Sequence, residues 1–198
     1  MNPWDERFKG EKFVYGTKPN VFLKEHIAVF DDKHLIACYA EGEGRNAVYL
    51  AQAGKQVTAY DYSVEGLQKA RHLAVQNEVS VATKQVDLLQ EELLTEAYDG
   101  AVMIFGHFAK VQQFAVLNKI MNSLKQGGIF LLEVYEDGQI TYGTGGPRVL
   151  DYLYHERHLK LWAEQHEIVH FFSGEVDRTE GLLHTGLCKV VQLIVKKQ

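Results

Sequence analysis

The sequence predicts an α/β fold, a doubly wound sheet of seven strands in which the last strand is antiparallel. Two observations favour it. Between residues 34 and 135, apolar runs of strand length alternate with segments of helical periodicity, which is the pattern of a parallel sheet. Two further strand-like runs, 168–175 and 187–195, follow with no long helix between them, and neighbouring strands joined in this way are antiparallel.

The first repeat, residues 34–54, is the stretch around which the chain is organised. Leu35 to Tyr39 predicts a strand, the turn AEGEG follows, and a helix is expected from Arg45 to Ala53, closed by Gly54. The letters GEGRNA fit the G-x-G-x-x-A pattern of dinucleotide sites, whose glycines let a ligand approach the main chain. A glycine-rich turn without a ligand is the alternative.

The charge of this turn distinguishes between ligands. A helix N-terminus favours an anion such as pyrophosphate, but Glu41 and Glu43 place two carboxylates there and only Arg45 opposes them. The turn therefore suits a positively charged ligand without phosphate. S-adenosylmethionine, with its sulfonium and ammonium groups, is such a ligand. The inference depends on Glu41, because the side chain of Glu43 has equal reason to face solvent.

Composition excludes several classes of protein. The chain has 198 residues, 46% of them hydrophobic, which is ordinary for one globular domain, and its formal net charge of −5 argues against nucleic acid as a partner. Cys38 and Cys188 lie in apolar runs and are expected to be buried free thiols, with no metal site. Because no signal peptide and no apolar run of about 20 residues is present, we expect no membrane partner and a cytoplasmic location.

An aromatic segment precedes the first strand. A helix is expected over residues 3–8, with Trp4 and Phe8 on one face, then a loop at 13–16 and a second helix over 19–30. This segment is either a lid over a ligand or a packed arm. Tyr15, beside a glycine, favours a ligand contact.

Acidic residues follow the next two strands. The strand 56–60 ends in Asp61, about 20 residues after the glycine turn, where Rossmann-like folds place a carboxylate on ribose hydroxyls. Ser63 is the expected cap of a helix that runs to residue 77. The strand 79–86 ends in Asp87, which either accepts a hydrogen bond from an adenine amino group or caps a short helix that starts at Leu88.

The fourth repeat leads to the second half of the chain. A buried strand over 101–105 precedes His107, and a helix over 110–125 is expected to end at Gly127-Gly128 before a strand over 129–135. The expected apolar side of that helix comprises Val111, Phe114, Leu117, Met121 and Leu124. A glycine-rich loop, 136–149, and a helix, 155–165, follow, and Gly181, His184, Thr185 and Gly186 are expected in the connection of the last two strands.

This order of elements resembles the class I S-adenosylmethionine-dependent methyltransferases over almost the whole chain. The matching stretches are AEGEGRNA, AYDYS, QVDLL, YDGAVMIF and LKQGGIFLLEVY. The small-molecule branch that includes the thiopurine and tellurite-resistance methyltransferases is the most similar. Its members carry a Trp and a later aromatic residue over the cofactor, and WDERF and FVYG would place Trp4 and Tyr15 there.

The resemblance implies a set of cofactor-binding residues. They are Trp4, Tyr15, Ala40, Glu41, Gly42, Gly44, Asn46, Asp61, Tyr62, Asp87, Leu88 and Phe105. Two positions depart from the family, because Cys38 replaces an acidic residue and Ala40 replaces a glycine. Since the acidic residue helps hold the methionine ammonium in the family, Glu41 is expected to take its place.

The resulting hypothesis is S-adenosylmethionine-dependent methyl transfer to a small-molecule acceptor, a thiol, amine, hydroxyl or metalloid, by in-line displacement that relies on proximity and orientation. His107, Tyr15 and His184 are the candidate catalytic residues. A non-catalytic module that binds S-adenosylmethionine or S-adenosylhomocysteine is the alternative. A NAD-dependent dehydrogenase is disfavoured, because it would need a further substrate domain. We expect one domain over 1–198, with an arm at 1–30, a cofactor half at 34–135 and a substrate side at 136–198.

Overall fold

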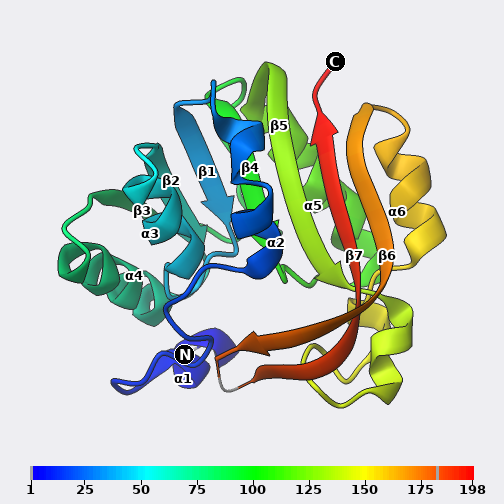
Figure 1. Ribbon diagram of the computed structural model, residues 1–198, viewed down its shortest axis with the longest axis horizontal. Coiled ribbons are helices and arrows are strands. Elements are labelled where there is room, and N and C mark those ends of the chain that lie inside the picture. Colours follow the sequence, from blue (N-terminus) through cyan, green and yellow to red (C-terminus); the bar gives the residue numbers. More distant parts are fainter. Residues whose placement is uncertain (1, 182) are drawn as a thin grey trace.

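The computed structural model describes residues 2–181 and 183–198, so Met1 and Leu182, which the expected domain includes, lie outside the described residues. Its centre is a seven-stranded sheet of order β3-β2-β1-β4-β5-β7-β6 (Figure 1). The strands are β1 (Leu35–Tyr39), β2 (Gln56–Asp61), β3 (Val81–Gln85), β4 (Tyr98–Ile104), β5 (Leu124–Tyr135), β6 (Glu167–Glu180) and β7 (His184–Lys196). Strand β7 is antiparallel to β5 and to β6, while β1 to β5 pair in parallel. The predicted fold class is confirmed.

Helices cover both faces of the sheet and build two cores. The helices are α1 (Pro3–Phe8), α2 (Val21–Glu25), α3 (Arg45–Gln52), α4 (Val64–Gln76), α5 (Lys110–Ser123) and α6 (Glu156–Ala163). One core joins apolar residues of α2, α3 and α4 to one face, and the other joins those of α5 and α6 to the opposite face. Ser63 caps α4 as predicted, because its hydroxyl accepts from the N–H of Gly66 at 3.0 Å.

Two predicted helices are wrong. The helix over 19–30 is divided into α2 and a 3-10 helix, Ile27–Phe30, because His26 leaves the helical region with φ −110° and ψ 17°. The short helix after Asp87 is a turn, in which that carboxylate accepts from the N–H of Leu89 at 2.9 Å. A local hydrogen bond from the side chain therefore replaces helical capping.

The end of α5, and its buried side in part, differ from the prediction, although Leu117 and Met121 are buried as expected. The helix ends at Ser123 and β5 begins at the next residue, so Gly127 and Gly128 lie within the strand. Val111 is 91% exposed, whereas Gln113 is buried. The Gln113 amide donates to the carbonyls of Phe108 and Leu153 at 3.1 and 3.0 Å, which satisfies it in the interior.

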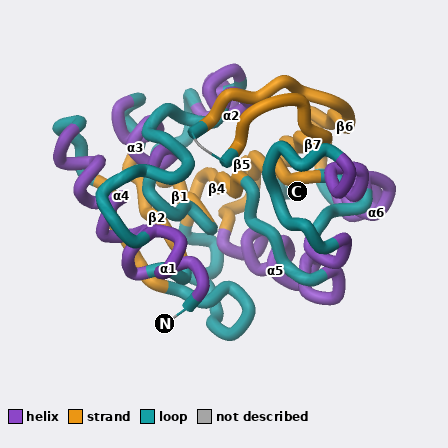
Figure 2. Tube along the Cα trace, turned by 90° about the horizontal axis from the view of Figure 1, so that it is seen from below, coloured by secondary structure: helices purple, strands orange, loops and turns teal. Residues whose placement is uncertain are grey.

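The last two strands form a longer hairpin than the sequence predicts. His184, Thr185 and Gly186, expected in the connection, belong to β7. The hairpin continues past the carboxyl ends of the parallel strands and bends toward α1 (Figure 1), and loops gather between these two elements in the view from below (Figure 2). At its tip, a Cβ on Gly181 would lie 2.3 Å from the backbone carbon of Tyr15. The hairpin and the N-terminal arm therefore meet over the edge of the sheet where the parallel strands end.

Within residues 2–181 and 183–198, the longest apolar helical stretches are too short to cross a membrane.

Candidate functional site

A cavity of about 940 Å³ lies at this edge, between the ends of β1, β2 and β4, the N-terminal arm and the hairpin. Every predicted site residue lines it except Gly44. Gly44 has φ +90°, and a Cβ there would lie 2.5 Å from the Cβ of Ala70 in α4. The structure therefore gives Gly44 a packing role, which lets the turn lie directly on α4.

Glu41 occupies the N-terminus of α3 from within the chain. Its Oε1 accepts from the N–H groups of Asn46 and Ala47, both at 2.8 Å. The carboxylate is buried at the cavity wall, and burial raises the pKa of Glu41 to about 7. Because this acid already satisfies the helix N-terminus, the turn is a poor site for a phosphate and leaves negative charge facing the cavity.

Asp61 fixes the glycine turn to the end of β2. Its carboxylate accepts from the N–H of Gly42 at 2.7 Å and from the N–H of Ser63 at 2.8 Å. Burial raises the pKa of Asp61 to about 6. A carboxylate keeps further lone pairs after two such bonds, so the group remains suited to accept from ribose hydroxyls.

Glu43 does not face solvent, so that alternative is wrong. It is buried, and Oε2 accepts from the N–H groups of Val14 and Tyr15 at 2.8 and 3.2 Å. Its Oε1 lies 2.8 Å from Nζ of Lys69. The second acid of the turn thus holds the N-terminal arm in place over the cavity.

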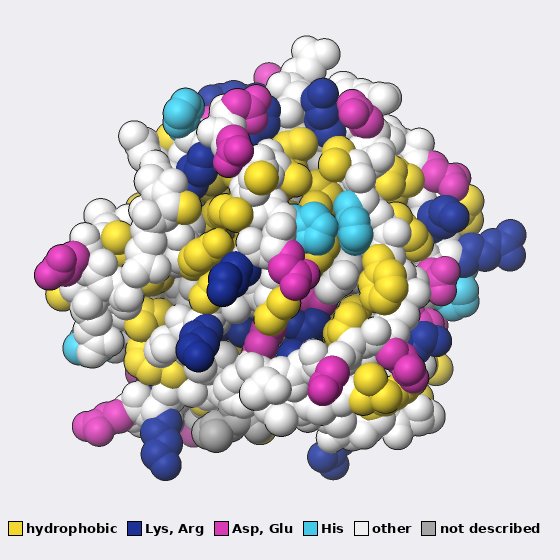
Figure 3. Space-filling model, viewed as in Figure 1, with side chains coloured by type: hydrophobic (Ala, Val, Ile, Leu, Met, Phe, Trp, Pro, Cys, Tyr) yellow, Lys and Arg dark blue, Asp and Glu magenta, His cyan; other side chains and the backbone are white. Residues whose placement is uncertain are grey.

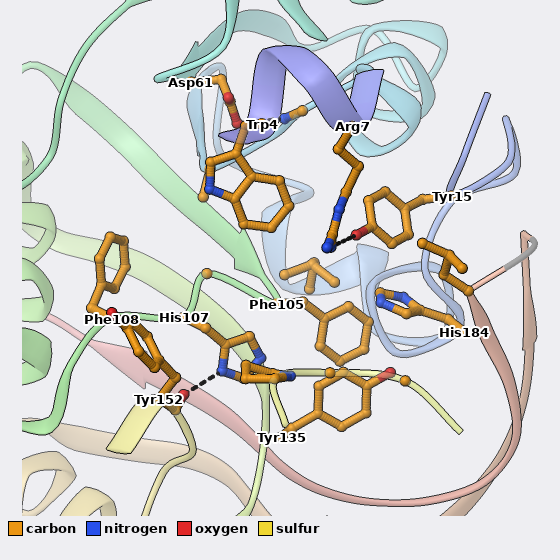
Figure 4. Close-up of a pocket in the computed structure, with 18 of the residues that line it drawn as sticks. Trp4, Arg7, Tyr15, Asp61, Phe105, His107, Phe108, Tyr135, Tyr152 and His184 are labelled. Carbon is orange, nitrogen blue, oxygen red and sulfur yellow. Dashed lines mark hydrogen bonds between the residues drawn. The ribbon is translucent and has the colours of Figure 1, made fainter. Parts of the chain in front are cut away.

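Arg7 is a site residue that the sequence analysis missed. It donates to the Tyr15 hydroxyl at 2.9 Å, and its guanidinium carbon lies 4.9 Å from the centre of the Trp4 ring. Figure 4 shows its head group pointing into the cavity beside both rings. The signal was present in WDERF, where Arg7 stands three residues after Trp4 and shares its helical face.

Aromatic rings form the cavity wall beyond the acidic strand ends. Phe105 follows β4 with φ +58°, a strained conformation for a bulky residue, and stacks on Tyr135 at 4.5 Å between ring centres. His184 meets Phe105 at 4.6 Å, and His107 lies parallel to Tyr135 at 5.6 Å. Figure 4 shows these rings grouped around the cavity. We call Phe105, His107, Tyr135 and His184 the ring chamber.

Both chamber histidines are kept neutral. His107 Nδ1 donates to the carbonyl of Tyr152 at 2.8 Å, and burial lowers the pKa of His107 to about 4. Burial, together with the nearby Arg45 and Arg178 guanidinium groups, lowers the pKa of His184 to about 2. Neither ring therefore carries charge near neutral pH.

A buried ionic cluster supports the chamber from below. The guanidinium of Arg178 lies 2.5 Å from the carboxylates of Glu133 and Glu180. The carboxylate of Glu180 also lies 2.5 Å from the guanidinium of Arg45. The guanidinium carbon of Arg178 lies 5.0 Å from the centre of the Phe105 ring. The cluster links the chamber, the hairpin and α3.

Basic and acidic side chains are not segregated from each other on the surface that Figure 3 draws. The described part of the chain contains no group of three or more His, Cys, Asp or Glu side chains placed to hold a metal ion. Both cysteines are free and buried, as predicted.

Comparison with known proteins agrees with this geometry. The family model of a methyltransferase domain matches residues 36–128. No curated protein matches the chain in sequence.

Solved structures of similar fold include methyltransferases. One is described as showing the conversion of a disulfide bond into a thioacetal group during echinomycin biosynthesis. It matches with a TM-score of 0.79 and 15% identity, over 98% of this chain and 91% of that protein's chain. An S-adenosylmethionine-dependent methyltransferase from Methanosarcina mazei matches with a TM-score of 0.70 and 15% identity, over 91% of this chain and 98% of that protein's chain. TehB from Haemophilus influenzae has a TM-score of 0.70 and 17% identity over 89% of this chain and 61% of its own.

These findings agree with the predicted enzyme class at the level of the matched segment and the fold. Residues 36–128 match a methyltransferase domain, and the sheet has the fold found in S-adenosylmethionine-dependent methyltransferases.

Proposed function

We propose that this chain, with its methyltransferase domain, transfers a methyl group from S-adenosylmethionine to a small-molecule acceptor by in-line displacement. One observation carries the proposal. A single cavity of about 940 Å³ joins the acidic strand ends to the ring chamber. Ligand sites span about 300–1,000 Å³, so this cavity is large enough for a cofactor and a second molecule side by side.

The cofactor side matches the charges of the ligand. S-Adenosylmethionine, when bound, supplies a methyl carbon made electrophilic by its sulfonium. Glu41 would hold the ammonium and Arg7 with Tyr15 the carboxylate, because they place opposite charges on the cavity wall beside the glycine turn. Asp61 would accept from the ribose hydroxyls and Asp87 from the adenine amino group.

The ring chamber would position the acceptor. Phe105, His107 and His184 line the same cavity as Asp61 and Glu41, so a molecule seated among the rings lies next to the cofactor side. The hairpin, the arm and the glycine-rich loop 143–146 enclose this space and limit access of water. Proximity, orientation and exclusion of water supply much of the acceleration of a displacement of this kind. The chamber also favours an enzyme over a module that only binds the cofactor.

Calorimetric titration with S-adenosylmethionine, S-adenosylhomocysteine and NADH tests the cofactor. We expect micromolar binding of the two adenosyl ligands and none of NADH, and Arg7→Gln should weaken both by about tenfold through loss of a charged hydrogen bond. Absence of adenosyl-ligand binding would refute the proposal. Turnover of any thiol, amine, hydroxyl or metalloid acceptor would exclude the binding module. We keep the cytoplasm as the predicted location.

A further inference from the structure

We propose that polar atoms buried in the ring chamber bind the nucleophilic group of the acceptor, and that this group arrives with its proton, as a hydroxyl or a thiol. The inference rests on the proposed function, because it concerns the acceptor side of the same cavity. The atoms are the Tyr135 hydroxyl, Nε2 of His107 and Nδ1 of His184. Each is buried without a hydrogen-bond partner among the residues that the structure describes.

Such atoms are unfavourable for folding. Tyr135 is fully buried and His184 is 6% exposed, so their unpaired polar groups have lost water and gained nothing in return. Other buried tyrosines are paired. Tyr154 donates to the carbonyl of Gly106 at 3.1 Å, and Tyr39 donates to the Ser123 hydroxyl at 2.8 Å. An unpaired hydroxyl lowers the stability of the fold, and a hydrogen bond to a bound ligand would explain why this one is present.

The unpaired atoms belong to neighbouring rings. The Tyr135 ring lies 5.6 Å from the His107 ring and 5.6 Å from the His184 ring, and all three residues line the cavity. Loop 143–146 covers the Tyr135 ring closely, since a Cβ on Gly145 would lie 2.8 Å from its hydroxyl and one on Gly146 would lie 2.6 Å from the ring. Gly145 and Gly146 have φ angles of 144° and 77°, which glycine adopts readily and other residues do not. A ligand reaches the hydroxyl when the loop shifts.

The hydrogen-bond geometry selects the kind of group. A carbonyl only accepts, so His107 Nδ1 must carry hydrogen to donate to Tyr152, and Nε2 then presents a lone pair. The Tyr135 hydroxyl can donate. A hydroxyl or a thiol, X–H, can donate to Nε2 of His107 and can accept from the Tyr135 hydroxyl. An oxyanion cannot donate and an ammonium cannot accept, so neither suits both kinds of atom.

This arrangement provides for the proton of the reaction. The X atom forms a bond to the methyl carbon while the carbon–sulfur bond breaks and its electron pair stays on sulfur, giving the neutral thioether. The proton of X–H passes to Nε2 of His107, which takes up the positive charge that the sulfonium loses, and then leaves to solvent. Because the methylated X atom is strongly acidic until it loses this proton, a weak base is sufficient.

Thermal unfolding of two matched variants tests the unpaired hydroxyl. Tyr154→Phe removes a paired hydroxyl and should lower Tm by about 2–4 °C, the shift expected when a chain of this size loses one hydrogen bond. Tyr135→Phe makes the same change at the unpaired hydroxyl and should leave Tm unchanged or raise it. A fall in Tm equal to that of Tyr154→Phe, or failure to fold, would show that Tyr135 has a structural partner and would overturn the inference.

Binding of phenol and toluene to the protein saturated with S-adenosylhomocysteine tests the selected group. The two probes differ in one hydroxyl, and we expect phenol to bind about tenfold more tightly, as one satisfied buried pair implies. In Tyr135→Phe and in His107→Asn, whose amide keeps a donor for the Tyr152 carbonyl, the preference should fall below about twofold. An unmodified protein that binds phenol no better than toluene, or binds neither, overturns the inference. Loss of S-adenosylhomocysteine binding would instead refute the proposed function, so the two failures are distinguishable.

Discussion

The carboxylate of Glu180 lies 2.5 Å from the guanidinium of Arg45, in an ion pair whose side chains are 3% and 7% exposed. This contact joins the tip of the β6–β7 hairpin to the first turn of α3, and so connects the cover of the cavity to the glycine turn. Glu180 also accepts from the N–H of Val21 at 3.0 Å and lies 2.5 Å from Arg178. One carboxylate therefore pairs with two buried cations, of which Arg178 also pairs with Glu133, and it fixes three segments.

Removal of this carboxylate should strongly destabilise the fold. We expect Glu180→Ala to lower the free energy of unfolding in urea by about 3–5 kcal/mol, because it leaves Arg45 as a buried charge without its partner. Glu167→Ala is the control, since its pair with Lys196 at 3.5 Å is exposed and should contribute less than about 1 kcal/mol. Equal losses in the two variants would contradict a buried ionic role for Glu180.

Cofactor affinity should depend on pH through Glu41. Burial raises the pKa of this carboxyl to about 7, and an ammonium binds only its ionised form. Between pH 7 and pH 6 we therefore expect the affinity for S-adenosylhomocysteine to fall by about fivefold, with release of a proton on binding at pH 6. Calorimetry in buffers of different ionisation enthalpy measures that proton. Glu41→Gln should remove the dependence, and an unchanged pH profile in this variant would exclude Glu41 as its source.

The raised pKa of Glu41 has the opposite effect on the folding stability of the ligand-free protein, which it favours at lower pH. The folded chain keeps the Glu41 proton up to about pH 7, whereas the unfolded chain loses it near the ordinary value of 4.5. Because the folded state binds more protons between these values, this group lowers stability as pH rises from 4.5 to 7. Urea denaturation at pH 5 and pH 7 should show a smaller loss in Glu41→Gln than in the unmodified protein.

Glu43 should control the N-terminal arm. We expect Glu43→Gln to speed tryptic cleavage after Lys9 and Lys12 by about tenfold, because a neutral side chain holds the Val14 and Tyr15 N–H groups less strongly and cannot pair with Lys69. Glu6→Gln breaks only an exposed pair with Lys9 and serves as the control. Unchanged cleavage in Glu43→Gln would mean that packing alone holds the arm.

The sequence was sufficient to place the acidic strand ends at one cavity, because their signals are local. Strand β1 has the predicted bounds, and Glu41, Asp61 and Asp87 lie at or just after the ends of strands that meet at the same edge of a parallel sheet. Chain order and periodicity were enough to bring them together.

The ring chamber and its surroundings depend on contacts between distant residues, which periodicity does not reveal. Glu133 and Arg178 are separated by 45 positions and meet only in the folded sheet. The sequence predicts Tyr135 only as a strand end. Its ring meets His107 because β5 pairs with β4, and it meets His184 because the hairpin brings the start of β7 to it. Gln113 is buried because two backbone carbonyls accept from its amide, and Val111 is exposed, so the expected buried side of α5 is right at Leu117 and Met121 and wrong at these two residues.

The two turn-forming glycines Gly44 and Gly54 allow strain to be separated from collision. Both have positive φ, +90° and +82°, but a Cβ on Gly44 would lie 2.6 Å from the backbone of Ala70, whereas a Cβ on Gly54 would meet nothing within 4 Å. We expect Gly54→Ala to cost about 1–2 kcal/mol in urea, the cost of a left-handed alanine, with S-adenosylhomocysteine affinity unchanged. Gly44→Ala must also displace the turn from α4, which moves the Gly42 N–H away from Asp61. Its affinity for S-adenosylhomocysteine should fall by at least about tenfold, as loss of one charge-assisted hydrogen bond implies. If both variants bind the ligand equally well, contact with α4 does not position the turn.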